Sequence, residues 1–76
     1  MESSEDLAPL LAEAQAHCDK GWWREARVAL GTLYEKGHRP AFTAQQIGDV
    51  EAALSHYDDA IRWHQQAITI EPRSYR

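Results

Sequence analysis

The chain has 76 residues, which is enough for one small domain and too few for a multidomain enzyme. A chain this short buries only about 60% of the surface that its unfolded form exposes, so we expect its core to need help from a partner. Eight Lys and Arg against twelve Asp and Glu give a net charge of −4, which repels phosphate and argues against a nucleic-acid partner. The single cysteine, Cys18, excludes a disulfide within the chain and fits a reducing compartment.

We expect neither a membrane segment nor export. The longest apolar runs, such as Leu10-Leu11-Ala12, are far shorter than the roughly 18 residues that cross a bilayer. Residues 1–6 form an acidic tail, whereas a secretory signal begins with basic residues and continues with an apolar stretch. The sequence therefore predicts a cytoplasmic protein without a membrane partner.

Two helices are predicted in the first half of the chain. Apolar residues at three- and four-residue spacing indicate a helix over about residues 7–19, in which Pro9 is tolerated because it falls in the first turn. Gly21 ends this helix. A second helix is expected over about residues 23–36, with Gly37 as its left-handed stop.

The second half predicts two more helices. One runs over about residues 41–53, although Thr43 and Gln46 have capping-box spacing and leave a later start open. The last runs over about residues 57–70, and Pro72 ends it. No segment alternates with period two over more than four residues and no Asn-Gly or Asp-Gly turn occurs, so the sequence predicts an all-α fold without strands.

The two halves repeat each other. The segment Trp23-Arg24-Glu25-Ala26 and the segment Tyr57-Asp58-Asp59-Ala60 share an aromatic residue and an alanine, and they lie 34 positions apart. Gly21 and Ser55, which both suit turns, keep the same offset. Each half is therefore expected to form one helix hairpin.

The second half resembles the tetratricopeptide repeat family, whose 34-residue helix pairs have small residues where helices approach closely. The residues that carry the resemblance are Ile47, Gly48, Tyr57, Ala60, Ile61, Ala67, Ile68, Ile70 and Pro72, and in the first half Trp23, Ala26, Leu30 and Leu33. This resemblance implies an all-α fold of two antiparallel helix hairpins stacked as a short α-solenoid. The expected units are an acidic tail (1–6), a first repeat (7–40), a second repeat (41–74) and a short tail (75–76).

Four positions depart from the family pattern. Glu13 falls where a core leucine is expected and Ala14 replaces the glycine, so the register of the first helix stays open. Glu51 and His64 are polar where the family prefers aromatic residues.

In this family the first helix of each pair lines a concave groove that holds a segment of another protein. The resemblance therefore implies a non-enzymatic binding module or scaffold with a protein or peptide partner. Transferred position by position, the groove residues are Leu11, Gln15, Asp19, Phe42, Gln45, Asp49 and Ala52. Such a groove carries Asp19 and Asp49 and no basic residue, which argues against a clamp for a C-terminal carboxylate.

Self-association is the second expected property. Repeat proteins generally need three or more units, or polar caps, to close their core, and this chain has two. Ile61, Ile68 and Ile70 of the last helix are left without a covering helix. We expect these isoleucines to form the interface of a homodimer, which assembles either by end-to-end stacking or by exchange of helix pairs.

Trp22 and Trp63 are expected at the surface, and Trp23 in the core.

Two other functions stay open. The chain can be a purely structural unit for homo-oligomerisation, with its groove filled by the partner subunit and no separate ligand. The weaker alternative is a metal or catalytic site built from His56, His64 and nearby carboxylates. Because the two histidines lie two turns apart and no H-E-x-x-H or paired C-x-x-C motif occurs, we predict no metal, no cofactor and no catalytic residue.

Overall fold

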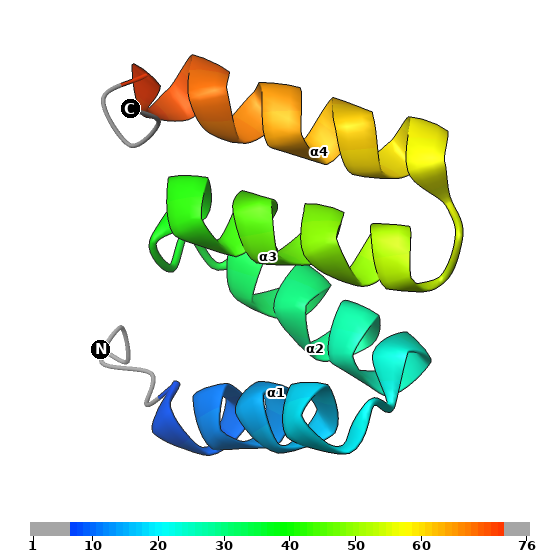
Figure 1. Cartoon of the computed structure of the whole chain (residues 1–76). Coiled ribbons are helices and arrows are strands. Elements are labelled where there is room, and N and C mark those ends of the chain that lie inside the picture. Colours follow the sequence, from blue (N-terminus) through cyan, green and yellow to red (C-terminus); the bar gives the residue numbers. More distant parts are fainter. Residues whose placement is uncertain (1–6, 73–76) are drawn as a thin grey trace.

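The computed structural model describes residues 7–72, which form four α-helices and no strand. The helices are α1 (Ala8–Lys20), α2 (Trp23–Glu35), α3 (Pro40–Ala53) and α4 (Tyr57–Ile70), as Figure 1 shows. The predicted all-α fold is confirmed, and every predicted helix boundary lies within one residue of the observed one. The predicted tails, and residues 73–74 of the second repeat, lie outside the described residues.

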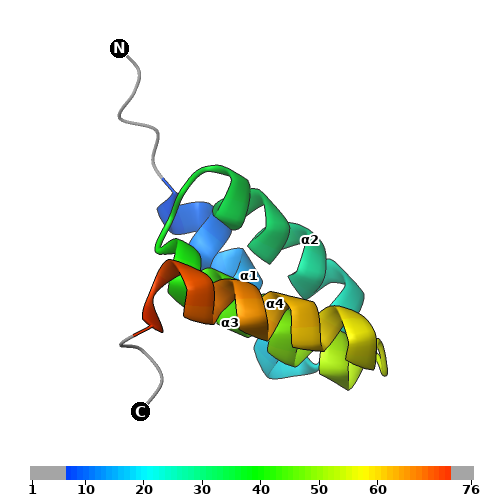
Figure 2. The same cartoon turned by 90° about the horizontal axis from the view of Figure 1, so that it is seen from above.

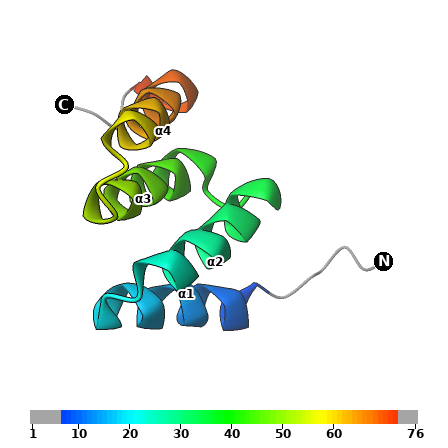
Figure 3. The ribbon, with the colours of Figure 1, turned by 90° about the vertical axis from the view of Figure 1, so that its right-hand side faces the viewer.

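The four helices follow one another in space as they do along the chain. Each helix runs opposite to its neighbours in sequence, so that α1 begins and α4 ends on the same side of the molecule (Figure 1). The helices pack as α1 on α2, α2 on α3 and α3 on α4. Figures 2 and 3 show the α3 and α4 pair lying over the α1 and α2 pair, which is a helix-hairpin arrangement.

The turns inside the two hairpins are equivalent. Gly21 after α1 has φ 74°, and Ser55, 34 positions later, has φ 67°, so both lie in the left-handed region. The Trp22 N–H donates to the carbonyl of His17 over 2.8 Å, and 34 positions later the His56 N–H donates to the carbonyl of Glu51 over the same distance. The 34-residue repetition of the sequence is therefore also a repetition of backbone geometry at these turns.

The connection between the hairpins decides where α3 begins. Gly37 has φ 77° and ends α2 as predicted, while Pro40 opens α3 at a position where a missing N–H costs nothing. The hydroxyl of Thr43 lies within α3 and donates to the carbonyl of His38 over 2.7 Å. Because Thr43 is not an N-cap, the later start of the third helix is wrong.

The core lies around α2, the helix that packs on both α1 and α3. Its cluster of buried apolar residues is made of Ala14 from α1, Ala26, Ala29, Leu30 and Leu33 from α2, and Ile47 and Val50 from α3. Leu7, Leu10 and Cys18 pack against this cluster from the α1 side, whereas Glu13 is exposed. The register that the sequence left open for the first helix is thereby fixed, with Ala14 inward and Glu13 outward.

Small residues bring α3 and α4 together. Ala44, Gly48, Ala60 and Ala67 are buried along this contact. Trp63 of α4 is half-buried and meets the ring of Tyr34 edge to face, with 5.1 Å between ring centroids, so its expected exposure is wrong. Trp22 is exposed and Trp23 packs against the core, as predicted.

Along residues 7–72, none of the helices has the length and apolar character that a bilayer-crossing segment requires.

Candidate functional site

A cleft of about 460 Å³ opens between α1 and α3. Residues from three helices and from the loop between the hairpins form its walls and floor. They are Leu11, Ala12, Ala14, Gln15 and Cys18 of α1, Leu30 and Leu33 of α2, His38 and Arg39 of the loop, and Phe42, Thr43 and Gln46 of α3.

The cleft has an apolar floor and a mixed rim. Leu30 and Leu33 are fully buried and belong to the core of α2, so they hold the floor rigidly. Leu11 of α1 and Phe42 of α3 are exposed at the edges, Phe42 with 45% of its surface open to solvent. An exposed aromatic ring beside an apolar floor gives an apolar side chain of another molecule a surface on which it can pack and become buried.

The charge of the cleft is opposite to that of the chain. Although the net charge is −4, no Asp or Glu among residues 7–72 contributes to the lining, and the basic or titratable groups in it are His38, Arg39 and Cys18. The Arg39 guanidinium lies 4.5 Å from the centroid of the Phe42 ring, a cation–π contact at the edge of the cleft. The cleft therefore holds a basic residue, Arg39, that is not among the seven predicted groove residues.

Three of the seven predicted groove residues line this cleft: Leu11, Gln15 and Phe42. Asp19, Gln45, Asp49 and Ala52 lie outside its lining. Asp19 accepts a hydrogen bond from the Gln15 side-chain amide at 3.0 Å, and Asp49 accepts one from His64 Nε2 at 3.1 Å. Both carboxylates are thus hydrogen-bonded within the chain, and neither lines the cleft.

Several lining residues were not predicted. Leu30 and Leu33 belong to the second helix of the hairpin, which the groove prediction leaves out, although their helical spacing with Ala26 marks them as core. Arg39 reaches the cleft because the loop residue before Pro40 takes φ 39°, in the left-handed region. The Arg-Pro pair marks a turn in the sequence, but the sequence does not indicate which side chain the turn directs at the cleft.

Cys18 is a poor nucleophile in this site. Burial raises the pKa of its thiol, and the neighbouring negative charge of Asp19 raises it further. The adjacent His17 has contacts elsewhere, with Nε2 3.4 Å from Glu13 Oε2 and its ring 5.7 Å from that of Trp22. The thiol therefore contributes to packing at the cleft wall.

The residues predicted for self-association divide into two groups. Ile61 and Ile68 are 55% and 42% exposed, and with Tyr57 they fall within about 40° of one another on the outer face of α4. Ile70 is half-buried and faces a shallow hollow formed with Arg39, Pro40, Ala41, Phe42 and Glu71. The outer apolar stripe of α4 is therefore Tyr57, Ile61 and Ile68, without Ile70.

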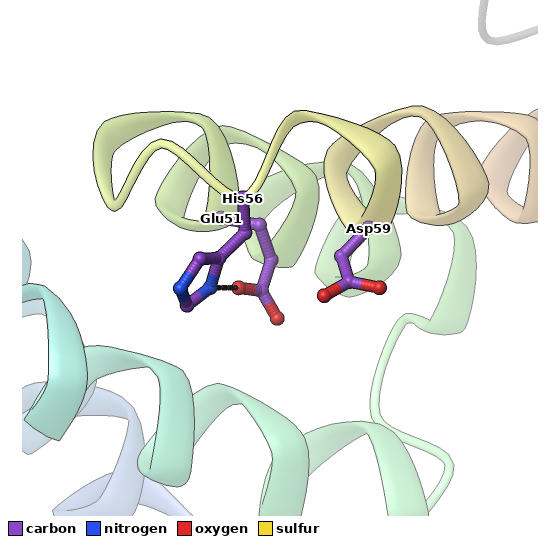
Figure 4. A group of neighbouring side chains, drawn as sticks. All are labelled: Glu51, His56 and Asp59. Atoms are coloured by element: carbon purple, nitrogen blue, oxygen red, sulfur yellow. Dashed lines mark hydrogen bonds and ion pairs between the residues drawn. The ribbon is translucent and has the colours of Figure 1, made fainter.

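A second polar centre lies where α3 turns into α4. The side chain of Glu51 is only 7% exposed, and its Oε1 accepts a 2.8 Å hydrogen bond from His56 Nδ1. The Arg27 guanidinium of α2 lies 3.5 Å from the same oxygen. Figure 4 shows Glu51 and His56 together with Asp59 of α4. His64, which the sequence grouped with His56, pairs with Asp49 instead and is not part of this centre.

In comparisons with known proteins, no family model, no curated protein and no solved structure matches this chain.

Proposed function

We propose that the chain is a non-enzymatic, cytoplasmic interaction module of the tetratricopeptide-repeat type that holds an extended segment of a partner protein in the cleft between α1 and α3. The observation that carries the proposal is the lining of this cleft, which joins an apolar floor, an exposed Phe42 and a cationic Arg39. A site of this composition binds a side chain and a charge, and it offers no activated group for chemistry.

Stacking of the two hairpins as tetratricopeptide-like repeats is part of the proposal. It is supported by the equivalent turns at Gly21 and Ser55 and by the family's small residues at the helix contacts. The best match is Gly48, whose backbone lies directly under the ring of His64. In such a stack the first helices of the two repeats, α1 and α3, flank one concave face, and a cleft lined by residues of both helices supports this arrangement.

The partner segment is defined by the chemistry of the cleft. An apolar side chain fits over Leu30 and Leu33, and Phe42 covers one of its flanks. Because Arg39 is at the rim and no acidic residue in the described part of the chain contributes to the lining, the preferred segment carries an Asp or Glu next to the apolar residue. Hydrogen-bonding side chains of Gln15 and Gln46 are in reach of the segment's backbone.

A selection from a displayed library of random 12-residue peptides tests this function. We expect the enriched peptides to share a large apolar residue flanked by an acidic one. Phe42→Ala removes the flanking ring and should weaken binding of a selected peptide at least about tenfold, the loss of one buried aromatic contact. Arg39→Glu should weaken it as well, and more strongly at low salt than at high salt.

The control for these variants is Tyr57→Ala, which removes an exposed aromatic ring from the far helix, α4. It should leave peptide binding unchanged. A library without any enriched consensus, or peptide binding that survives Phe42→Ala, contradicts the proposal. Circular dichroism of each variant verifies that the helices are intact.

A second candidate function, assembly through α4, is favoured by the outer stripe of Tyr57, Ile61 and Ile68. These three large apolar side chains lie exposed on one face of α4, and exposed apolar patches often mark contact surfaces. A second copy of the chain would cover them about a two-fold axis and extend the small core. In this version the module is a homodimer, and assembly rather than peptide binding is its function.

A further inference from the structure

Three potential metal ligands gather where α3 passes into α4. Glu51 lies in the last turn of α3, His56 directly precedes α4, and Asp59 lies in the first turn of α4. One ligand atom from each residue, two carboxylate oxygens and one imidazole nitrogen, lies within 4.8 Å of the other two. Figure 4 shows the three groups on the same side of the turn.

The backbone holds two of these ligands in place. The His56 N–H donates to the carbonyl of Glu51, and Ser55 between them takes φ 67° to allow this closure. As a result His56 Nδ1 and Glu51 Oε1 lie 2.8 Å apart. Two ligand atoms of a tetrahedral zinc ion lie about 3.3 Å apart, given bonds of about 2.0–2.1 Å. A zinc ion can therefore replace the proton between His56 Nδ1 and Glu51 Oε1 if these two atoms move apart by about half an ångström.

The burial of Glu51 calls for a strong counter-charge. A carboxylate that is 7% exposed between packed helices is costly unless it is paired. Its present partners are a histidine and Arg27, whose nearest nitrogen is 3.5 Å away, at the limit of a hydrogen bond. The side chains of His56 and Asp59 are each about half exposed, so an ion can enter from solvent.

We propose that Glu51, His56 and Asp59 bind one late first-row divalent cation of the Zn²⁺ type, with water completing its coordination. One imidazole and two carboxylates suit Zn²⁺ better than Ca²⁺, which takes six to eight oxygens. Binding requires a free lone pair on His56 Nδ1, so a neutral ring shifts its proton from Nδ1 to Nε2, and a doubly protonated ring releases its Nδ1 proton to solvent. The bound ion links the end of α3 to the start of α4.

Titration of tag-free protein with Zn²⁺ tests this site, followed by calorimetry and by thermal melting. A Cys18→Ser background removes the only thiol. We expect saturable binding of one ion per chain, and a melting temperature raised by about 10 °C or more when Zn²⁺ exceeds its dissociation constant a hundredfold. His56→Ala and Asp59→Asn should each lower the affinity at least about tenfold.

Two matched variants separate this site from general attraction of cations. His64→Ala removes a histidine that also pairs with a carboxylate, Asp49, and it should leave Zn²⁺ binding unchanged. Arg27→Gln removes a competing positive charge 3.5 Å from Glu51 Oε1 and should tighten Zn²⁺ binding several-fold.

The result that overturns the proposal is a protein whose melting temperature does not respond to 1 mM Zn²⁺. Binding that persists in His56→Ala, or that is lost equally in His64→Ala, overturns it as well. Because His56 and Asp59 are exposed, their variants test the site even if a Glu51 variant fails to fold. This inference is independent of peptide binding in the cleft, since it uses none of the lining residues.

Discussion

The backbone of Gly48 in α3 lies directly against the imidazole ring of His64 in α4. A methyl group built on Gly48 would lie 2.6 Å from His64 Nε2, closer than side-chain atoms approach. The ring is held there by the hydrogen bond from Nε2 to Asp49 Oδ1, 3.1 Å long. His64 therefore packs against the backbone of α3 while its ring nitrogen stays hydrogen-bonded.

Gly48→Ala should destabilise the protein by about 1–3 kcal/mol, because the ring must leave and break its bond to Asp49. In a His64→Ala background the same substitution should instead be neutral or stabilising by up to about 1 kcal/mol, since alanine is the better helix former. Gly31→Ala is the control, because a methyl group there meets nothing within 4 Å. Chemical denaturation measures all four proteins. A Gly48→Ala penalty that persists without His64 contradicts this packing.

Ala67→Leu should destabilise the protein by about 1–3 kcal/mol, because Ala67 is fully buried and a larger side chain must push α4 away from its neighbours. Ala53→Leu introduces the same side chain at an exposed position of α3 and should change stability by less than about 0.5 kcal/mol. Thermal melting compares the two. Equal stability of both variants would mean that α4 does not pack as described.

Cys18 should react slowly with iodoacetamide at pH 8, because burial raises the pKa of its thiol and leaves little thiolate. At a fixed pH below the thiol pKa, each unit by which the pKa is raised lowers the thiolate fraction, and with it the reaction rate, about tenfold. Unfolding in guanidinium should restore the rate of an ordinary thiol. Asp19→Asn removes the second cause of the raised pKa and should speed the reaction. Glu13→Gln, which neutralises an exposed acid on the same helix, should leave the reaction rate of Cys18 unchanged.

The same thiol makes stability depend on pH. Since the folded chain keeps its proton to higher pH than the unfolded chain does, the free energy of unfolding should fall as the pH rises above the ordinary thiol pKa of 9.0. Cys18→Ser should remove this part of the alkaline loss. An unchanged alkaline profile in Cys18→Ser would contradict the assignment.

Replacement of both Ile61 and Ile68 by Lys should convert a dimer into a monomer, because it places two charges on the outer stripe of α4. Sedimentation velocity measures the change. Val28→Lys alters an exposed apolar residue on α2 and should leave the dimer intact. If the unsubstituted protein sediments as a monomer at all concentrations, the proposed assembly function is wrong.

Local features of the sequence determined the helices, their ends and their repetition. Apolar spacing identifies each helix, and Gly21, Gly37 and Pro40 mark turns wherever they occur, because their backbone preferences do not depend on distant contacts. The 34-residue offset followed from the same local features. The helix boundaries are for this reason predicted to within one residue.

Only the tertiary structure decided what lines the cleft and how the buried polar residues are paired. Arg39 enters the cleft, Asp49 turns to His64 and Trp63 packs on Tyr34 because of the angles and offsets at which the helices cross. The pairing of Glu51 with Arg27 joins positions 24 residues apart on different helices. Such contacts depend on how helices are placed in three dimensions, and helical periodicity fixes only which face of each helix is apolar.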